Sequence, residues 1–251
     1  MDVYPPPILY KYMSISNIIP NRLSKSGGSF TGIDTLREMI VEEKIWYSKP
    51  SSFNDPFEFQ NIKCVGFKNH RLTPDQIHKR NTSYGGSSLS KCGIICFCNN
   101  NTDIRMWAYY ADGHKGICIC FKCEESPFFD NRLYNVTYDD DIVEFEIDLN
   151  DMDRDLFLRQ VSTKAKCWEH EGEYRIVNPP SSIHKSDGYG LKPFPASLIE
   201  GIIFGLKTLP EHKKEIIEII GQKNAQINLY QAAPVDGQLI MGSNLLLSLF
   251  N

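Results

Sequence analysis

The sequence has no long apolar run and little net charge. No stretch approaches the roughly 18 consecutive apolar residues of a membrane-spanning helix. The first residues, Met-Asp-Val-Tyr-Pro-Pro-Pro, contain no basic stretch followed by an apolar run. Lysine plus arginine number 27 and aspartate plus glutamate number 31, so the net charge is only −4. This balance gives no electrostatic reason for general binding to nucleic acid or to an anionic membrane, and we expect a cytoplasmic protein with no membrane partner.

Four signatures of common enzyme classes are also missing. The chain contains no G-x-x-x-x-G-K-[ST], no G-x-G-x-x-G, no H-E-x-x-H and no G-x-S-x-G. These are the patterns of P-loop nucleotide binding, dinucleotide binding, zinc proteases and serine hydrolases. What is present is ordinary globular composition, since 41% of the 251 residues are hydrophobic and 12% are aromatic. A chain of this size buries a full core without disulfide or metal cross-links.

The eight cysteines do not form a zinc pattern. Cys96 and Cys98 are separated by one residue, and so are Cys118 and Cys120, whereas zinc knuckles use two residues between ligands. Only Cys120 and Cys123 have that spacing. Alternate residues of a strand share a face, so we expect these pairs to be reduced thiols that pack as small hydrophobic side chains. No metal is expected.

Periodicity of the apolar residues predicts an α+β fold with a β-rich centre flanked by helices. We expect one domain over residues 1–251, with a mobile polar insertion at about 68–91 and a βαβ-like unit at about 199–231. Strands are predicted at 8–13, 45–48, 93–98, 116–121, 134–138, 142–149, 174–177, 199–204, 225–230 and 238–241, and helices at 33–43, 104–111, 153–167 and 209–220.

The segment Phe53-Asn-Asp-Pro-Phe-Glu58 places two carboxylates between aromatic residues. Asp55 as N-cap, Pro56 at the first helical position and Glu58 three residues after the cap would form a helix start that resembles a capping box. We favour this structural interpretation. The alternative is a ligand site, to which Asn54 would contribute.

A second segment, Trp107-Ala-Tyr-Tyr-Ala-Asp-Gly-His-Lys-Gly116, places aromatic residues at the end of the predicted helix and a His-Lys pair in the following turn. Trp107 is expected in the core, because a large aromatic residue at helical spacing is usually buried there. Tyr109 or Tyr110, together with His114 and Lys115, lies where rigid elements end, which is where binding groups collect. They are therefore candidate ligand contacts.

The densest polar cluster is Trp168-Glu-His-Glu-Gly-Glu-Tyr-Arg175. Glu169, Glu171 and Glu173 alternate, so in an extended chain they would point the same way and raise one another's pKa. Such a group could hold a cation, a metal or sugar hydroxyls. The alternative, which we rate equally, is a set of salt bridges to Arg175 or to nearby lysines.

Together with Tyr-Lys-Tyr at 10–12 and Trp-Tyr-Ser-Lys-Pro at 46–50, these motifs resemble a widespread bacterial family of unknown function. The order of elements also resembles the ADP-ribosyltransferase superfold. Enzymes of that superfold open with a strand that carries an aromatic or basic pair, continue into a helix and a short strand, and place a glutamate at a later strand, often as E-x-E. Here Lys11 stands where histidine or arginine is common, and Glu171-Gly-Glu173 corresponds to the E-x-E.

The resemblance implies that NAD is a substrate. Cleavage of the nicotinamide–ribose bond builds an oxocarbenium-like cation, which a carboxylate stabilises. Glu173 would have that role and Glu171 would orient or deprotonate an acceptor, whose identity the sequence does not give. The expected nucleotide contacts are Tyr10, Lys11, Tyr12, Asn54, Tyr110 and His114.

The expected function is thus that of an NAD-using ADP-ribosyltransferase or NAD glycohydrolase in bacterial stress or phage defence. One alternative is a non-enzymatic ligand-binding or regulatory module in which the motifs serve as caps and packing. Another is a metal-dependent nuclease that uses Asp55, Glu58, His114 and Glu173, although no spacing requires a metal.

Overall fold

The computed structural model describes residues 6–23, 29–60, 62–67, 73–76, 89–124, 126–130, 132–147, 154–181, 183, 186–223, 226–236 and 238–241. The chain divides into two compact units. Unit 1 consists of Met1–Ile45, Phe97–Asn131 and Leu191–Asn251, and unit 2 of Trp46–Cys96 and Arg132–Gly190. The expected single domain stays a prediction, because one domain can contain two compact units.

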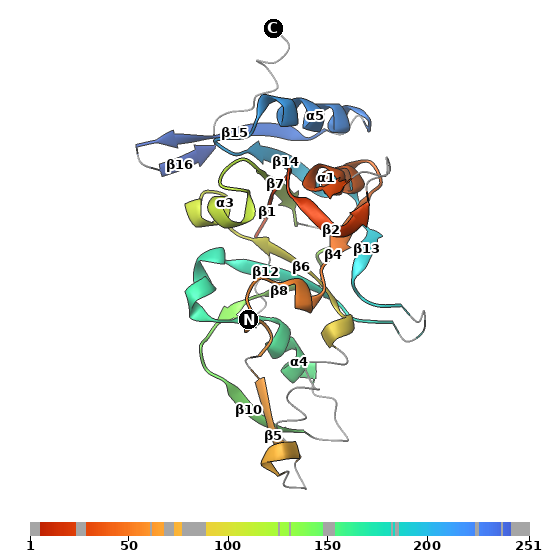
Figure 1. The fold of residues 1–251 in the computed structure, drawn as a ribbon, viewed down its shortest axis with the longest axis vertical. Helices are drawn as coiled ribbons and strands as arrows, with labels where there is room; N and C mark the ends of the chain where they lie inside the picture. The colour runs from red at the N-terminus through yellow and green to blue at the C-terminus, as the bar shows by residue number, and fades with distance from the viewer. Residues whose placement is uncertain are drawn as a thin grey trace. The chain divides into compact units, whose positions relative to one another are not determined.

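Unit 1 is built on a sheet with the strand order β16-β15-β14-β7-β1, followed by the last residues of β6. β1 and β7 are antiparallel, β7 and β14 are antiparallel, β14 and β15 are parallel, and β15 and β16 are antiparallel. These neighbouring strands are drawn in the upper part of Figure 1. Their bounds are Ile8–Met13 (β1), Gly93–Cys98 (β6), Ile117–Lys122 (β7), Ile199–Phe204 (β14), Asn228–Val235 (β15) and Gln238–Met241 (β16).

Three helices accompany this sheet among the described residues of unit 1. α1 (Gly32–Ile40) begins after Thr31, whose backbone N–H donates to the Asp34 carboxylate at 2.9 Å. α3 (Ile104–Tyr110) begins after Asp103, which accepts from the first turn. α5 (Pro210–Gly221) joins the parallel strands β14 and β15. This unit also contains β2 (Ile18–Leu23) and β3 (Ser29–Thr31), which pair antiparallel.

The core beside α3 centres on Trp107, which is fully buried. Its ring meets Tyr12 edge to face with centroids 5.1 Å apart. Burial raises the pKa of Cys120 to about 12, so this thiol stays neutral and packs as an apolar group. The expectation of free, buried cysteines is confirmed for Cys98, Cys118 and Cys120, whereas Cys96 is free but only half-buried. The buried members of this cluster are Tyr12, Cys98, Met106, Trp107, Ala111, Cys118, Cys120, Ile203, Ala232 and Leu239.

Unit 2 contains the strands that carry the densest polar motif. β12 (Glu173–Asn178) lies between β6 and β8 (Leu133–Asn135) in strand order and pairs antiparallel with β8. Two parallel pairs accompany them, namely β5 with β10 and β9 with β11. The bounds are Ile62–Phe67 (β5), Thr137–Tyr138 (β9), Val143–Ile147 (β10), Arg154–Val161 (α4), Thr163–Lys164 (β11), and, for the 3-10 helices, Pro50–Ser52 (η1), Leu89–Lys91 (η2) and Lys166–Glu171 (η3).

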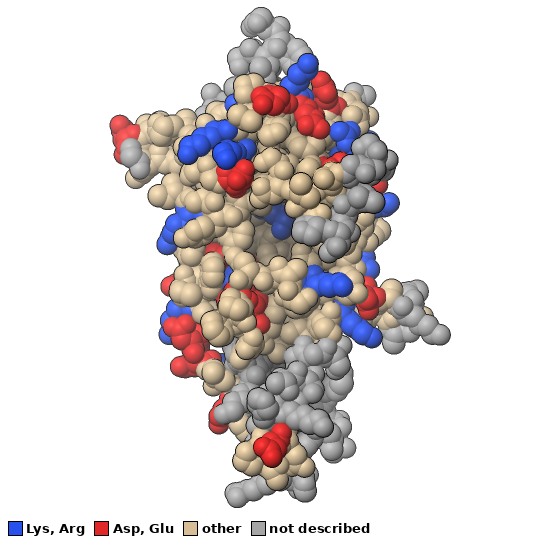
Figure 2. Space-filling view, in the orientation of Figure 1, with Lys and Arg blue, Asp and Glu red and all other residues tan. Residues whose placement is uncertain are grey.

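The remaining elements are β4 (Lys44–Tyr47), β13 (Gly190–Pro193) and the 3-10 helix η4 (Ala196–Leu198). No helix in the described part of the chain is long and apolar enough to cross a membrane. Figure 2 shows lysine and arginine interspersed with aspartate and glutamate over the face it draws, rather than gathered by sign. This distribution agrees with the small net charge of −4.

The structure confirms the expected α+β class, with a large sheet flanked by helices. The helix predicted at 153–167 is too long, because α4 ends at Val161 and the chain becomes the strand β11. Thr163 is β-branched and suits a strand, and pairing with β9 overrides helix propensity here. The polar stretch 68–91 lies outside the described residues except for 73–76 and 89–91.

Truncation of the Trp107 side chain tests the core of unit 1. Trp107→Ala removes a fully buried ring and should lower the free energy of unfolding by about 3–5 kcal/mol. The matched control is Tyr109→Ala on the same helix, where the side chain is 66% exposed and the expected loss is within about 0.5 kcal/mol. Urea unfolding followed by circular dichroism measures both. Equal losses in the two variants would contradict this description of the core.

Candidate functional site

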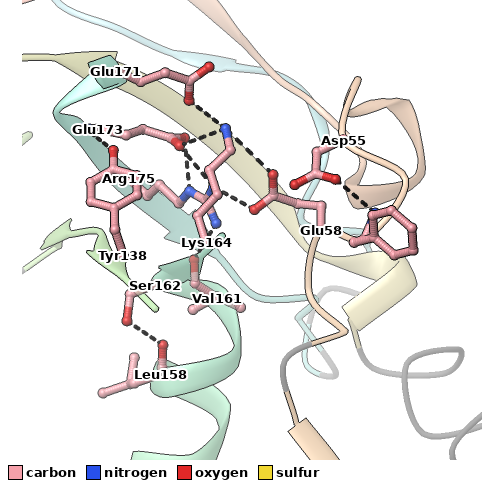
Figure 3. Close-up of polar contacts among 11 residues, drawn as sticks. Asp55, Glu58, Tyr138, Leu158, Val161, Ser162, Lys164, Glu171, Glu173 and Arg175 are labelled. Carbon is pink, nitrogen blue, oxygen red and sulfur yellow. Dashed lines mark hydrogen bonds and ion pairs between the residues drawn. The ribbon is translucent and has the colours of Figure 1, made fainter. Parts of the chain in front are cut away.

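The candidate site is a network of buried charged side chains in unit 2, centred on Arg175 (Figure 3). The guanidinium group is fully buried. Its Nε donates to Glu173 Oε1 at 2.8 Å, and its Nη2 donates to Glu173 Oε2 at 2.9 Å and to Glu58 Oε1 at 2.6 Å. Nη1 donates to the backbone carbonyl of Val161 at 2.7 Å. One cation therefore holds two carboxylates and the end of a helix.

Lys164 is the second cation of the network. Its Nζ donates to Glu171 Oε2 and, at 3.2 Å, to Glu173 Oε2, and it lies 3.6 Å from Glu58 Oε2. The ring of Trp168 covers the ammonium group at 5.0 Å from Nζ to the ring centroid. A buried cation against an aromatic face gains electrostatic stabilisation in addition to its ion pairs. Lys164 thus links all three carboxylates.

The protonation states follow from burial and from these pairings. Burial raises the pKa of Glu173, but the charge and hydrogen bonds of Arg175, together with Lys164, outweigh it and lower the pKa to about 2. Burial lowers the pKa of Lys164, yet the carboxylates around it, Glu173 first, raise that pKa above its ordinary value. Burial raises the pKa of Glu58 despite its two cationic neighbours. Glu173 is therefore ionised at neutral pH, and Glu58 takes up a proton at a higher pH than Glu173 does.

Local structure explains how these side chains meet. Gly172 adopts a left-handed conformation with φ 49°, which favours glycine, and turns the chain from η3 into β12. Glu173 and Arg175 are alternate residues of β12 and share a face. The backbone N–H of Glu173 donates to the Tyr138 hydroxyl at 2.7 Å. β9 and β11 pair Tyr138 with Lys164, which brings the ammonium group to the start of β12.

The segment 53–58 contributes differently from what the sequence predicts. The expected helix start is wrong, because residues 56–59 form turns. Asp55 does accept from the backbone N–H of Phe57 at 2.9 Å, but Glu58 bonds to Arg175 instead of returning to the start of the turn. Arg175 is fully buried, and a buried guanidinium group without a carboxylate partner is strongly destabilising, so Glu58 serves the ion pair rather than a cap. Asn54 is exposed.

Aromatic rings enclose the guanidinium group on the side of this turn. The Arg175 carbon Cζ lies 5.3 Å from the ring centroid of Phe59 and 5.8 Å from that of Phe53. The two rings meet edge to face at 5.3 Å. The aromatic residues that frame the motif thus exclude water from the cation that the motif binds.

The three alternating glutamates do not act as one group. Glu171 and Glu173 are buried, whereas Glu169 lies in η3 and is exposed. The salt-bridge alternative is confirmed, since Glu173 pairs with Arg175 and both buried glutamates pair with Lys164. The sequence interpretation missed Lys164, because it fell inside a predicted helix. The available signal was the β-branched Thr163 directly before Lys164, which favours a strand over a helix.

The other predicted ligand contacts, apart from Asn54, belong to unit 1. Tyr10 and Tyr110 are half-buried and pack on the core cluster beside α3, and Lys11 is also half-buried. Tyr12 is 7% exposed and donates its hydroxyl to the Asn100 carbonyl at 3.1 Å. His114 has φ 73°, and its ring stacks on Trp107 at 6.1 Å. Burial and then Lys207 lower its pKa.

The positions of the four residues proposed for a metal-dependent nuclease do not support that alternative. Among the described residues no group of three or more histidine, cysteine, aspartate or glutamate side chains is arranged to hold a metal ion. Glu58 and Glu173 share Arg175. Asp55 accepts a backbone hydrogen bond, and His114 belongs to the other unit.

Comparison with known proteins gives one match. Residues 106–176 match the model of a family described as a protein of unknown function (DUF2971). The match confirms the resemblance to a family of unknown function, and it includes the segments at 107–116 and 168–175. The description of that family names no activity. No curated protein and no solved structure matches the chain.

The low pKa of Glu173 predicts how stability depends on pH. The folded protein holds this pKa at about 2, against an ordinary value of 4.5. The carboxylate therefore contributes stability above pH 4.5, on the order of 3 kcal/mol, and this contribution is lost as the pH falls toward 2. Urea unfolding from pH 7 to pH 2 should show this loss in the wild type, and the loss should be reduced in Glu173→Gln.

The matched control is Glu169→Gln, which changes an exposed glutamate in the neighbouring segment. Its stability should follow the wild-type curve across the same pH range. A Glu173→Gln variant whose acid-dependent loss equals that of the wild type would show that Glu173 does not titrate with a lowered pKa.

Proposed function

We propose that this chain cleaves the bond between nicotinamide and ribose in NAD and passes ADP-ribose to an acceptor or to water. The observation that supports this most is the state of Glu173, an ionised carboxylate fixed at the first residue of a strand, two residues after a second buried glutamate. In the sequence, Glu171-Gly-Glu173 resembles the E-x-E of the ADP-ribosyltransferase superfold, and this resemblance also supports the proposal.

The chemistry needs a carboxylate that is charged and held in place. When nicotinamide leaves with the bonding electron pair, positive charge develops on the ribose ring. A preorganised carboxylate stabilises that charge without reorganising during the reaction. Glu173 would have this role. A water molecule or an acceptor group then adds to the ribose carbon and loses a proton, which Glu171 would accept.

The proposal requires the cover of the network to move. The side chains of Glu171 and Glu173 are only 4% and 5% exposed, so a substrate cannot touch them in this conformation. Trp168 of η3 lies over Lys164. Displacement of the segment Lys166–Glu171, which contains both Trp168 and Glu171, would expose Glu171, Glu173 and Lys164 to solvent.

A second candidate is a non-enzymatic ligand-binding or regulatory module, and a specific observation favours it. Every carboxylate of the network is within ion-pair distance of Arg175 or Lys164, and all five side chains are at most 5% exposed. A network so completely paired can serve structure alone. In that case its loss would change stability without any effect on NAD.

Nicotinamide release from NAD by the purified protein separates the two candidates. Wild type, Glu173→Gln and the control Glu169→Gln would be compared with and without bacterial lysate as a source of acceptors. The NAD-cleaving function predicts release by wild type and by the control, and a loss of about a hundredfold or more in Glu173→Gln. Circular dichroism establishes that the inactive variant is folded.

Two results would count against this function. Absence of release from wild type, with and without lysate, would contradict NAD cleavage and favour the module. Undiminished release from a folded Glu173→Gln variant would show that another group stabilises the cation.

A further inference from the structure

Glu171 enters the charged network of unit 2 from a different element than the other two carboxylates. It is the last residue of η3, whereas Glu173 lies in β12 and Glu58 in the turn before β5. In Figure 3, Glu171 and Glu58 approach the ammonium group of Lys164 from opposite sides. A movement of η3 would therefore carry one carboxylate away from the lysine and leave the other two in place.

Two side chains of η3 lie on the network, and both contact Lys164. The Glu171 carboxylate accepts a hydrogen bond from Nζ, and the centroid of the Trp168 ring lies 5.0 Å from the same atom. Glu171 is the buried residue of this helix, and Trp168 is half-buried. A group that competes for the ammonium group of Lys164 therefore competes with the attachment of η3 to the network.

The backbone changes direction at both ends of η3. Ala165 before the helix is extended, and Gly172 after it is left-handed with φ 49°. The first backbone N–H, that of Lys166, donates to the exposed Asp140 carboxylate at 2.9 Å, a bond that water can replace. Hydrogen bonds of a 3-10 helix have poorer geometry than those of an α-helix, so the helix itself adds little to this conformation. η3 can therefore leave the network while β11 and β12 stay folded.

Departure of Glu171 would change the charge balance of the network. Its five charged groups are Glu58, Glu171, Glu173, Lys164 and Arg175. When all are ionised, three carboxylates face two cations, and the net charge is negative. Without Glu171 the charges are balanced, so the site no longer repels an incoming anion.

The same departure would leave Lys164 short of acceptors. An ammonium group has three N–H donors. Among the described residues, Lys164 would keep one hydrogen bond, to Glu173 at 3.2 Å, because Glu58 at 3.6 Å lies beyond hydrogen-bond distance. A cation in so enclosed a position requires a replacement for the acceptor that it has lost.

We propose that a phosphate of a nucleotide diphosphate replaces the Glu171 carboxylate on Lys164, which makes Lys164 the phosphate-binding residue and its pair with Glu171 an autoinhibitory contact. The inference rests on the proposed function, because NAD contains a diphosphate. Each phosphate of a dinucleotide carries a single negative charge, as a carboxylate does, so the exchange conserves the charge of the network. Phosphate oxygens accept charge-assisted hydrogen bonds from lysine. The exchange also releases Glu171, which the proposed function requires as the acceptor of a proton.

Titration calorimetry with ADP-ribose, the part of NAD that remains after nicotinamide leaves, tests the exchange without any cleavage. Glu171→Gln should bind ADP-ribose about tenfold more tightly than wild type, because the ligand no longer has to displace a carboxylate. Misfolding cannot produce such a gain. Lys164→Met in the Glu171→Gln background should weaken binding by about tenfold or more. The matched control Glu169→Gln, an exposed glutamate of the same helix, should bind as wild type does.

Tryptophan fluorescence follows the release of η3 in the same titration. ADP-ribose should increase the quenching of fluorescence by acrylamide, because Trp168 would leave Lys164 and enter solvent. Trp168→Phe should abolish this increase. Adenosine, which has no phosphate, should neither increase the quenching nor bind more tightly to Glu171→Gln than to wild type.

Failure of this inference is distinguishable from failure of NAD cleavage. Equal affinity of wild type and Glu171→Gln for ADP-ribose would overturn the inference, and so would absence of ADP-ribose binding by both proteins or binding without increased quenching. These results do not depend on NAD cleavage. Tighter binding by Glu171→Gln, together with no nicotinamide release by wild type, would contradict the proposed function and support the diphosphate site.

Discussion

The burial of Arg175 is the constraint on which unit 2 depends. A guanidinium group without solvent contact is stable only when its charge and its donors are matched, because desolvation of a charge costs several kcal/mol. The chain meets this need with Glu58, Glu173 and the Val161 carbonyl. A turn, a helix end and a strand that are distant in sequence are therefore held by one side chain. Loss of any partner would leave a buried donor of the guanidinium group without its acceptor.

The same constraint gives the network its chemical character. Arg175 and Lys164 keep Glu173 ionised, which a carboxylate that stabilises a sugar cation must be. They also occupy its oxygen atoms, which a substrate would have to reach. The same set of contacts is therefore compatible with a catalytic role and with a purely structural role. They differ only in whether Lys166–Glu171 moves aside.

Elements with strong local signals could be predicted from the sequence. The apolar runs of β1, β6 and β14 and the amphipathic pattern of α5 predicted elements close to the observed bounds. Local pattern also identified the segments at 53–58 and 168–175 as unusual. It did so because carboxylates flanked by aromatic residues are uncommon on an ordinary surface.

Features that depend on distant contacts could not be predicted in this way. The pairing of Glu58 with Arg175 spans 117 positions, and nothing local distinguishes it from a capping interaction. Lys164 was assigned to a helix, because its contribution depends on pairing between β9 and β11. In each case tertiary context outweighed local preference.

The central claim is that the segment at 53–58 and the strand β12 are joined by a buried ion pair. A double-mutant cycle with Glu58→Gln and Arg175→Met, measured by urea unfolding at neutral pH, tests this claim most directly. We predict a coupling energy above about 1 kcal/mol, because each single change leaves a buried group without its partner. A coupling energy near zero would show that the two segments are held together by other contacts, and would contradict the account.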